Sequence, residues 1–322
     1  MNAAEPAAGN PPQPSRLAAA GQAVWRALAS FGLLRESWVG MAGALIVLVW
    51  ALVALFAPLL APVDPNMPIA PFAKPGATVA IPVSADLSPL ARYLAESQEY
   101  THTFWLGADH LGRDILSRII WGTRTVLFYA PLATLAAYTV GILMGVAAGY
   151  RGGLVDDVLS RIADIILSFP VLVLYIIIIA IIGASGVNII IAITFASSPG
   201  IMRIVRGLVL DLRTRDYIFA AQTRGESHWY IMLVELLPNA RGPLIVDACL
   251  RLGYVIITIG VLGFLGLGLP PPDPDWGGMV NETRQMALAF PHMTLFPCIA
   301  ISSLILGFNL LADGLREISL RD

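Results

Sequence analysis

Long apolar runs dominate this sequence and decide which folds are open to it. Several exceed the roughly 18 residues that mark a membrane-spanning helix. Six spans are expected, at residues 38–61, 125–149, 163–184, 187–203, 243–268 and 291–312. Only 13% of the residues are charged, about half the fraction of a soluble domain. The expected fold is therefore an all-α membrane protein with six transmembrane helices.

The regions outside these spans differ in composition. Residues 1–20 are rich in Pro, Ala and polar residues, which predicts a disordered tail. Residues 21–37 fit either an interfacial helix along the membrane or an extension of the first span. Residues 62–124 form a long loop with a Pro-rich, polyproline-like start, and residues 315–322 form a short C-terminus. The fourth span contains Ser-Ser-Pro-Gly at 197–200, and Pro199 is expected to kink it.

Basic residues predict the orientation, because cytoplasmic loops are enriched in Arg and Lys. With the N-terminus inside, six of the 20 basic residues lie outside and the other 14 inside. The outside residues are Lys74, Arg92, Arg113, Arg118, Arg124 and Arg284. This bias places both termini in the cytoplasm.

Several classes of function are disfavoured. The formal net charge of −2 gives no basic footprint for nucleic acid. Lys74, the only lysine, follows no glycine pattern of a P-loop, so the chain does not bind ATP by that route. Cys249 and Cys298 lie in apolar runs and are best interpreted as small core residues. No nucleophile–base pair or metal-ligand spacing stands out, so neither an enzyme nor a bound cofactor is expected.

Three polar or glycine-rich features have competing interpretations. His102, Asp109, His110 and Asp114 suggest a metal site, but a loop with helix caps and ion pairs is favoured. Asp247 and Arg251, four residues apart and toward the cytoplasmic end of span five, fit an ion pair or a polar lining of a substrate path. Glycines in the run 263–272 favour close helix packing, and its prolines a stiff turn.

The polar segment 211–240, between spans four and five, has an ordered local pattern. Asp216 is expected to cap a helix that ends at Arg224, and Gly225 to take the left-handed conformation. Ser227 then caps a second helix that runs to Pro238. The paired Ala220 and Ala221 leave one side of this knuckle without bulk, so that a partner surface can approach closely.

This segment resembles the "EAA" loop of permease subunits of ABC importers, which reads Glu-Ala-Ala, three residues, Gly and, further on, Leu-Pro. The matching residues are Ala220, Ala221, Gly225, Leu237 and Pro238. Residues 106–124, 262–280 and 304–317 also resemble the dipeptide, oligopeptide and nickel permeases. The similarity covers roughly residues 38–320.

The resemblance implies a type I importer permease in the bacterial inner membrane, forming half of a translocation pathway for peptides. Nickel chelates and glutathione-like compounds are alternative substrates; an ATP-independent secondary transporter is the rival class. The implied partners are a second permease, two ATP-binding subunits (separate or fused) that hold ATP and Mg, and a periplasmic binding protein. The implied coupling residues are Asp216, Tyr217, Phe219, Ala220, Ala221, Arg224, Gly225, Leu237 and Pro238.

One residue departs from the family pattern. Phe219 stands where the family has Glu. A Glu there would form a capping box with Asp216, which Phe219 cannot close, so Asp216 is expected to cap alone. An aromatic contact with the partner is expected to replace the polar one.

Overall fold

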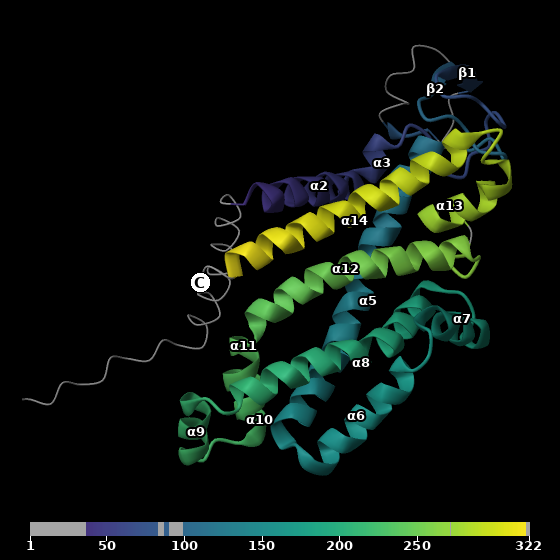
Figure 1. Ribbon diagram of the computed structural model, residues 1–322. Coiled ribbons are helices and arrows are strands. Elements are labelled where there is room, and N and C mark those ends of the chain that lie inside the picture. The colour runs from purple at the N-terminus through teal and green to yellow at the C-terminus, as the bar shows by residue number, and fades with distance from the viewer. Residues whose placement is uncertain (1–36, 83–86, 90–98, 271, 320–322) are drawn as a thin grey trace, which may run out of the picture.

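The computed structural model describes residues 37–82, 87–89, 99–270 and 272–319 (Figure 1). The predicted tail 1–20 and all but the last residue of the predicted interfacial helix 21–37 lie outside the described residues. Pro271, in the middle of the triple proline, also lies outside them.

The first and last membrane helices lie side by side (Figure 1). They are α2 (Trp38–Leu55) and α14 (Pro291–Ser319). A Cβ added to Gly43 would lie 2.3 Å from the backbone nitrogen of Leu311, and one added to Gly314 would lie 2.3 Å from the Cα of Gly40. Such contacts are impossible for any real side chain, so these glycines allow the two backbones to approach each other closely.

A second pair, α5 (Ile115–Arg151) and α8 (Gly186–Leu212), packs by the same means. Gly141, Gly145 and Gly149 recur every four residues and therefore share one face of α5. They face Ile201, Val205 and Val209 of α8, and an added Cβ would lie 2.6–2.9 Å from the nearest atom of these side chains. The small-residue stripe thus sets the spacing of the central helices.

Three helices are longer than the spans predicted for them, and one of these, α14, continues past its predicted end at residue 312 to Ser319. The helix predicted at 125–149 begins ten residues earlier, at Ile115, because the Asp114 side chain accepts a 2.7 Å hydrogen bond from the backbone N–H of Ser117. The helix predicted at 187–203 continues to Leu212, so Pro199 does not interrupt it. Pro199 is buried against neighbouring helices, which is where a membrane helix tolerates proline.

The predicted span 163–184 is wrong as a single helix. It consists of the end of α6 (Gly153–Leu167) and all of α7 (Val171–Ile182), which meet at an angle of 89°. Pro170 lies in the break, where its missing N–H and fixed φ end the preceding helix. The amphipathic α6 is attached to α8 by ion pairs from Asp156 to Arg206 and from Asp164 to Arg203.

Among the described residues, five helices are long and apolar enough to cross a membrane. They are α2, α5, α8, α12 (Arg241–Phe264) and α14. The bent pair α6 and α7 makes a sixth if it is counted as one broken span. Exposed side chains such as Trp38, Leu45 and Leu135 give these helices an apolar outer surface suited to lipid.

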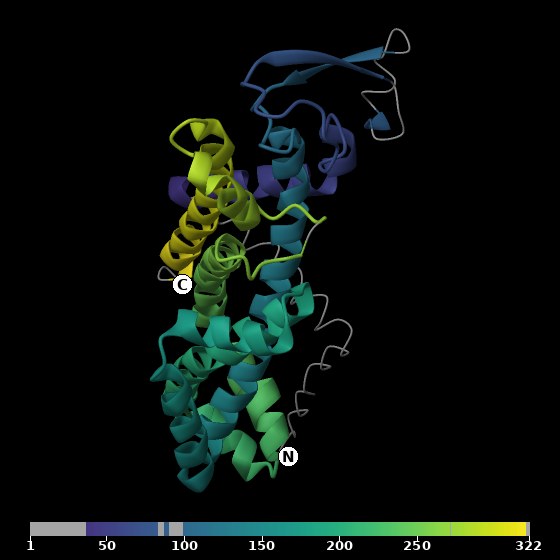
Figure 2. The same ribbon diagram turned by 90° about the vertical axis from the view of Figure 1, so that its right-hand side faces the viewer.

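A small region outside the membrane helices lies at one end of the molecule (Figure 2). It contains α3 (Ala57–Leu60) and a hairpin of β1 (Ala77–Pro82) and β2 (Glu99–Phe104), paired antiparallel with Val79 opposite His102. Beside it lie α13 (Trp276–Thr283) and the 3₁₀ turn η3 (Arg284–Met286). The hairpin was not predicted, because prolines obscure the alternation of apolar residues that places Val79 and Ile81 on one face.

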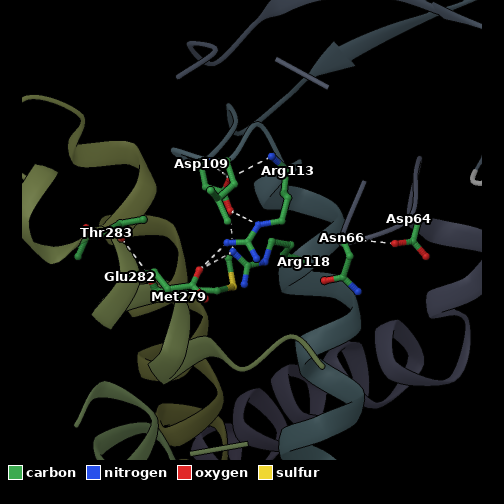
Figure 3. A network of polar contacts seen from close by, with 10 residues as sticks. Asp64, Asn66, Asp109, Arg113, Arg118, Met279, Glu282 and Thr283 are labelled. Carbon is green, nitrogen blue, oxygen red and sulfur yellow. Dashed lines mark hydrogen bonds and ion pairs between the residues drawn. The ribbon is translucent and has the colours of Figure 1, made fainter. Parts of the chain in front are cut away.

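Four charged side chains join this region to α13 (Figure 3). In this outer network, Asp109 accepts hydrogen bonds from Arg118 at 2.6 Å and from Arg113 at 2.7 Å. Glu282 accepts from Arg118 at 3.0 Å and from Arg113 at 2.6 Å. Burial alone would raise the pKa of Glu282, but Arg118 and Arg113 outweigh it and lower this pKa. The interpretation of Asp109 and Asp114 as ion-pair and cap residues is confirmed.

The glycines at the end of α12 allow close packing against α13, as predicted. A Cβ on Gly263 would lie 2.1 Å from a carboxylate oxygen of Asp275, and a Cβ on Gly277 would lie 2.1 Å from the carbonyl oxygen of Gly260. Asp275 caps α13 by accepting from the N–H groups of Gly277 and Gly278. Burial raises the pKa of Asp275 to about 6, although these two hydrogen bonds oppose the rise.

Candidate functional site

The polar segment 211–240 lies at the end of the molecule opposite the β-hairpin (Figures 1 and 2). It contains α9 (Asp216–Thr223), α10 (His228–Tyr230), the π-helical turn η2 (Ile231–Leu236) and α11 (Leu237–Asn239). A short helix, a turn and a second helical stretch were predicted here, and the structure has this order.

The turn between the two helices has the predicted geometry. Gly225 has φ +76°, the left-handed conformation. The N–H of Glu226 donates to the carbonyl of Ala221 at 3.2 Å, and the N–H of Gly225 donates to that of Gln222 at 2.9 Å. This pair of bonds is a Schellman motif, which satisfies carbonyls at the end of α9. The Ser227 hydroxyl then accepts from the N–H of Tyr230 at 3.2 Å, which confirms Ser227 as the next cap.

The predicted start of α9 is wrong by one residue. Arg215 occupies the N-cap position without a side-chain cap bond, and Asp216 is the first helical residue. The negative charge of Asp216 therefore interacts favourably with the positive N-terminal end of the helix dipole, and Asp216 does not cap the helix. Because Arg215 is the cap, position 218 is the third helical residue, and a Glu at position 219 would not complete a capping box.

The prediction that Ala220 and Ala221 share one open side is also wrong. Ala221 and Ile218 are fully buried and pack against Ile231, Met232 and Leu236. Ala220 is exposed. Adjacent helical residues point about 100° apart, so they cannot share a narrow face.

The exposed side of α9 consists of Asp216, Phe219, Ala220 and Thr223, all exposed. Their spacing of three and four residues places them on one face of the helix, which we call the free face. Phe219 is 54% exposed there. Nothing in the described part of the chain covers this face. The aromatic ring of Phe219 lies at its center, beside the methyl group of Ala220.

A groove of about 610 Å³ lies beside the free face. It is lined by Tyr150, Arg151, Arg213, Thr214, Phe219, Gln222 and His228. Nη1 of Arg213 donates to the carbonyl of Gly149, at the end of α5, at 3.1 Å. The hydroxyl oxygen of Tyr150 lies 3.2 Å from Nδ1 of His228. These contacts attach the segment to the end of α5 and leave a groove with two arginines and aromatic walls.

The remaining predicted coupling residues occupy varied positions. Arg224 pairs with Glu235 at 3.3 Å and Glu226 at 3.7 Å, so it stabilises the turn. Tyr217 is half-buried, its phenol oxygen makes no hydrogen bond within the described residues, and burial raises its pKa. Leu237 packs against the core beneath the segment, and Pro238 is exposed.

The predicted ion pair forms within α12. Nε of Arg251 donates to Oδ2 of Asp247 at 2.8 Å, and the Tyr138 hydroxyl of α5 donates to the same oxygen. Arg251 lies ten residues after the start of α12 at Arg241 and 13 before its end at Phe264. Arg251 is therefore near the middle of the helix, whereas Asp247 lies six residues after its start. Arg251 lines a cavity of about 340 Å³ between α5, α7, α8 and α12.

The family profile described as "Binding-protein-dependent transport system inner membrane component" matches residues 141–322. The profile of the N-terminal TM domain of oligopeptide transport permease C matches residues 22–75. The chain belongs to the binding-protein-dependent transport system inner membrane component family. This permease is thus a multi-pass inner-membrane protein that works with other subunits of an ABC importer.

Two curated relatives illustrate the similarity. The dipeptide transport system permease protein DppC of Alkalihalophilus pseudofirmus is 36% identical over 91% of this chain and 88% of the relative. The glutathione transport system permease protein GsiD of Pectobacterium atrosepticum is 41% identical over 66% of this chain and 71% of the relative.

A solved structure shares the fold of this permease. A chain of the MetNI methionine ABC transporter, in inward-facing conformations, aligns with a TM-score of 0.51 and 18% identity. The alignment covers 63% of this permease and 95% of that chain.

Some residues of the site were not singled out from the sequence. Tyr138 carries a hydroxyl group within an apolar run, a signal that could have suggested a polar partner for Asp247. Arg151 and Arg213 were counted only for orientation, because their meeting at one groove depends on α5 and α8 ending side by side.

Proposed function

We propose that this chain forms half of the peptide pathway of an ABC importer and that segment 211–240 couples it to an ATP-binding subunit. The observation that carries the proposal is the free face of α9. Ile218 and Ala221 of α9 pack against their own chain, whereas Phe219 and Ala220 remain uncovered beside a groove. Aromatic residues are enriched in protein–protein interfaces.

Peptides are the substrate class that best fits the relatives. The two relatives are named as dipeptide and glutathione transport permeases, and both compounds are short peptides. A nickel-chelate substrate remains the alternative of the same family.

The proposed assembly contains a second permease of similar fold, two ATP-binding subunits and a periplasmic binding protein. Both termini and the segment 211–240 face the cytoplasm, and the β-hairpin end faces the binding protein. Reporter fusions after residues 80 and 320 test this orientation: the first should report outside and the second inside. Reports from the same side would contradict it.

ATP is proposed to act through the partners. Closure of the ATP-binding subunits moves α9 and thereby the helices packed on it, and this requires contacts that differ between the open and closed states. Segment 211–240 packs on residues of α5 and α8, such as Val146 and Val205, which gives such a path into the membrane helices.

Reconstitution tests the function directly. The complete complex in liposomes, with binding protein and ATP, should accumulate radiolabelled dialanine and trialanine, and the chain alone should not. Accumulation by the chain alone without nucleotide would overturn the proposal. A complete complex that imports nickel chelates but neither peptide would overturn its substrate class.

A further inference from the structure

We propose that Arg251 binds the C-terminal carboxylate of a peptide as it passes through the cavity between α5, α7, α8 and α12. This inference rests on the proposed function, since it assumes a peptide cargo. It assigns a chemical role to one residue of that path.

The geometry of Arg251 leaves its binding edge unused. Among the nitrogens of Arg251, only Nε donates to Asp247. The terminal nitrogens Nη1 and Nη2 pair with no carboxylate within the described residues. They lie beside α8, where a Cβ added to Gly200 would be 3.6 Å from Nη1. The absence of a side chain on Gly200 keeps this end of the guanidinium open. Two parallel N–H groups on a planar guanidinium match the two oxygens of a carboxylate.

The cavity around Arg251 suits a short peptide. Its volume of about 340 Å³ lies within the range of small-molecule sites. Hydroxyl groups line it at Thr134, Tyr138, Tyr175, Ser197, Tyr254 and Thr258, and apolar walls come from residues such as Leu172 and Ile257. The hydroxyls can bond amide groups of the backbone, and the apolar walls can accept varied side chains.

Charge explains why the cavity selects an anionic group. Arg251 is the only lining residue with a formal charge among the described residues of this cavity. Arginine has donors only, and it remains protonated even when partly buried. A carboxylate in this weakly polar surrounding is stabilised more strongly than it would be in water.

Asp247 prevents this stabilisation from trapping the cargo. Asp247 and Tyr138 hold the guanidinium in place, and the aspartate charge offsets part of the arginine charge. A transport site must bind its cargo strongly enough to admit it and weakly enough to release it. An arginine paired on one edge and open on the other meets both requirements.

The test compares trialanine with trialanine amide, which lacks only the terminal charge. Initial uptake of each is measured in liposomes with the complete complex, at peptide concentrations that saturate the binding protein. In the Arg251→Gln variant, uptake of the free acid relative to the amide should fall about tenfold. The variant Asp247→Asn/Arg251→Gln, which also removes the aspartate charge, should show the same fall.

Arg203→Gln is the matched control, because Arg203 also pairs with an aspartate but lies on an exposed surface outside the cavity. Its uptake ratio should equal that of the wild type. An unchanged ratio in Arg251→Gln, or acid uptake at the wild-type rate, would overturn the proposal. Failure of the wild type to import either compound would instead contradict the peptide function itself.

Discussion

Two eight-residue helices at opposite ends of the molecule, α9 and α13, use their side chains in opposite ways. In α13, Trp276 is fully buried and donates to the carbonyl of Ile119 at 3.0 Å. In α9, Phe219 is 54% exposed. The partners of α13 are within this chain, whereas we propose that the free face of α9 contacts another subunit. A short helix beyond the membrane spans can thus serve either the fold or an assembly.

The ion pairs near the two helices follow the same division. At α13, Arg118 and Asp109 are 5% and 3% exposed, so loss of either would leave an unpaired buried charge. At α9, Arg224 and Glu235 are 54% and 23% exposed, and such pairs contribute about 0–1 kcal/mol. The α13 end is therefore expected to govern stability and the α9 end to govern assembly.

The largest expected effect is on stability, from Trp276→Ala. Loss of the buried indole, its hydrogen bond and its edge contact with Trp50 should lower the free energy of unfolding by about 3–5 kcal/mol. Thermal unfolding of the detergent-solubilised chain measures this effect. Trp105→Ala is the control, because Trp105 is 66% exposed. Equal melting temperatures for the two variants would contradict the role given to α13.

The adjacent alanines of α9 separate packing from docking. Ala221→Trp should disrupt the buried contacts of α9 and lower stability by about 1–3 kcal/mol. Ala220→Trp should leave the melting temperature unchanged and abolish co-purification with the ATP-binding subunit. Co-purification at the wild-type level in Ala220→Trp would show that the free face is not the interface.

Gly225→Val tests whether the left-handed turn between α9 and α10 is needed for coupling. A left-handed conformation costs a residue with a Cβ about 1–2 kcal/mol. Apart from the chain neighbours of Gly225, no described residue lies within 4 Å of the added Cβ, so the expected penalty is backbone strain. Peptide uptake should fall, while protein abundance stays normal. Gly207→Val, at a helical glycine with equally open surroundings, is the control. Normal uptake by Gly225→Val would remove the turn from the coupling mechanism.

The smallest effect concerns pH at the α13 end. The folded-state pKa of Asp275 is raised to about 6 from its usual 3.8, so the folded protein binds this proton more tightly than the unfolded chain. Stability should therefore increase as pH falls from 7 to 5, and Asp275→Asn should reduce this increase by roughly a few degrees in melting temperature. The pKa of Glu282 is shifted the opposite way, so this group lowers stability only once pH falls below the ordinary glutamate pKa of 4.5 toward its lowered folded-state pKa. Identical pH profiles for wild type and variant would contradict the burial argument.

The sequence predicted best what depends on short stretches. Hydropathy located the membrane helices, and Gly225 and Ser227 marked the turn correctly, since their conformations depend on local bonds. The predictions from sequence failed where contacts with neighbouring helices determine the local structure. Pro199 continues a helix because other helices surround it, whereas Pro170 lies in a break.

The candidate site shows the same limit. The resemblance predicts that segment 211–240 is the coupling segment, but which of Ala220 and Ala221 faces outward depends on how α9 packs against η2. The pairing of Asp247 with Arg251 followed from their spacing. The contribution of Tyr138 did not, because it comes from another helix.

Photocrosslinking from the free face tests the central claim most directly. A benzoyl-phenylalanine placed at Phe219 keeps the aromatic ring, and irradiation of membranes containing the complete complex should link this chain to the ATP-binding subunit. The same group at Trp105, at the opposite end, should not form this product. No link from position 219 in a complex that still co-purifies with the ATP-binding subunit would contradict the account, as would an equal link from position 105.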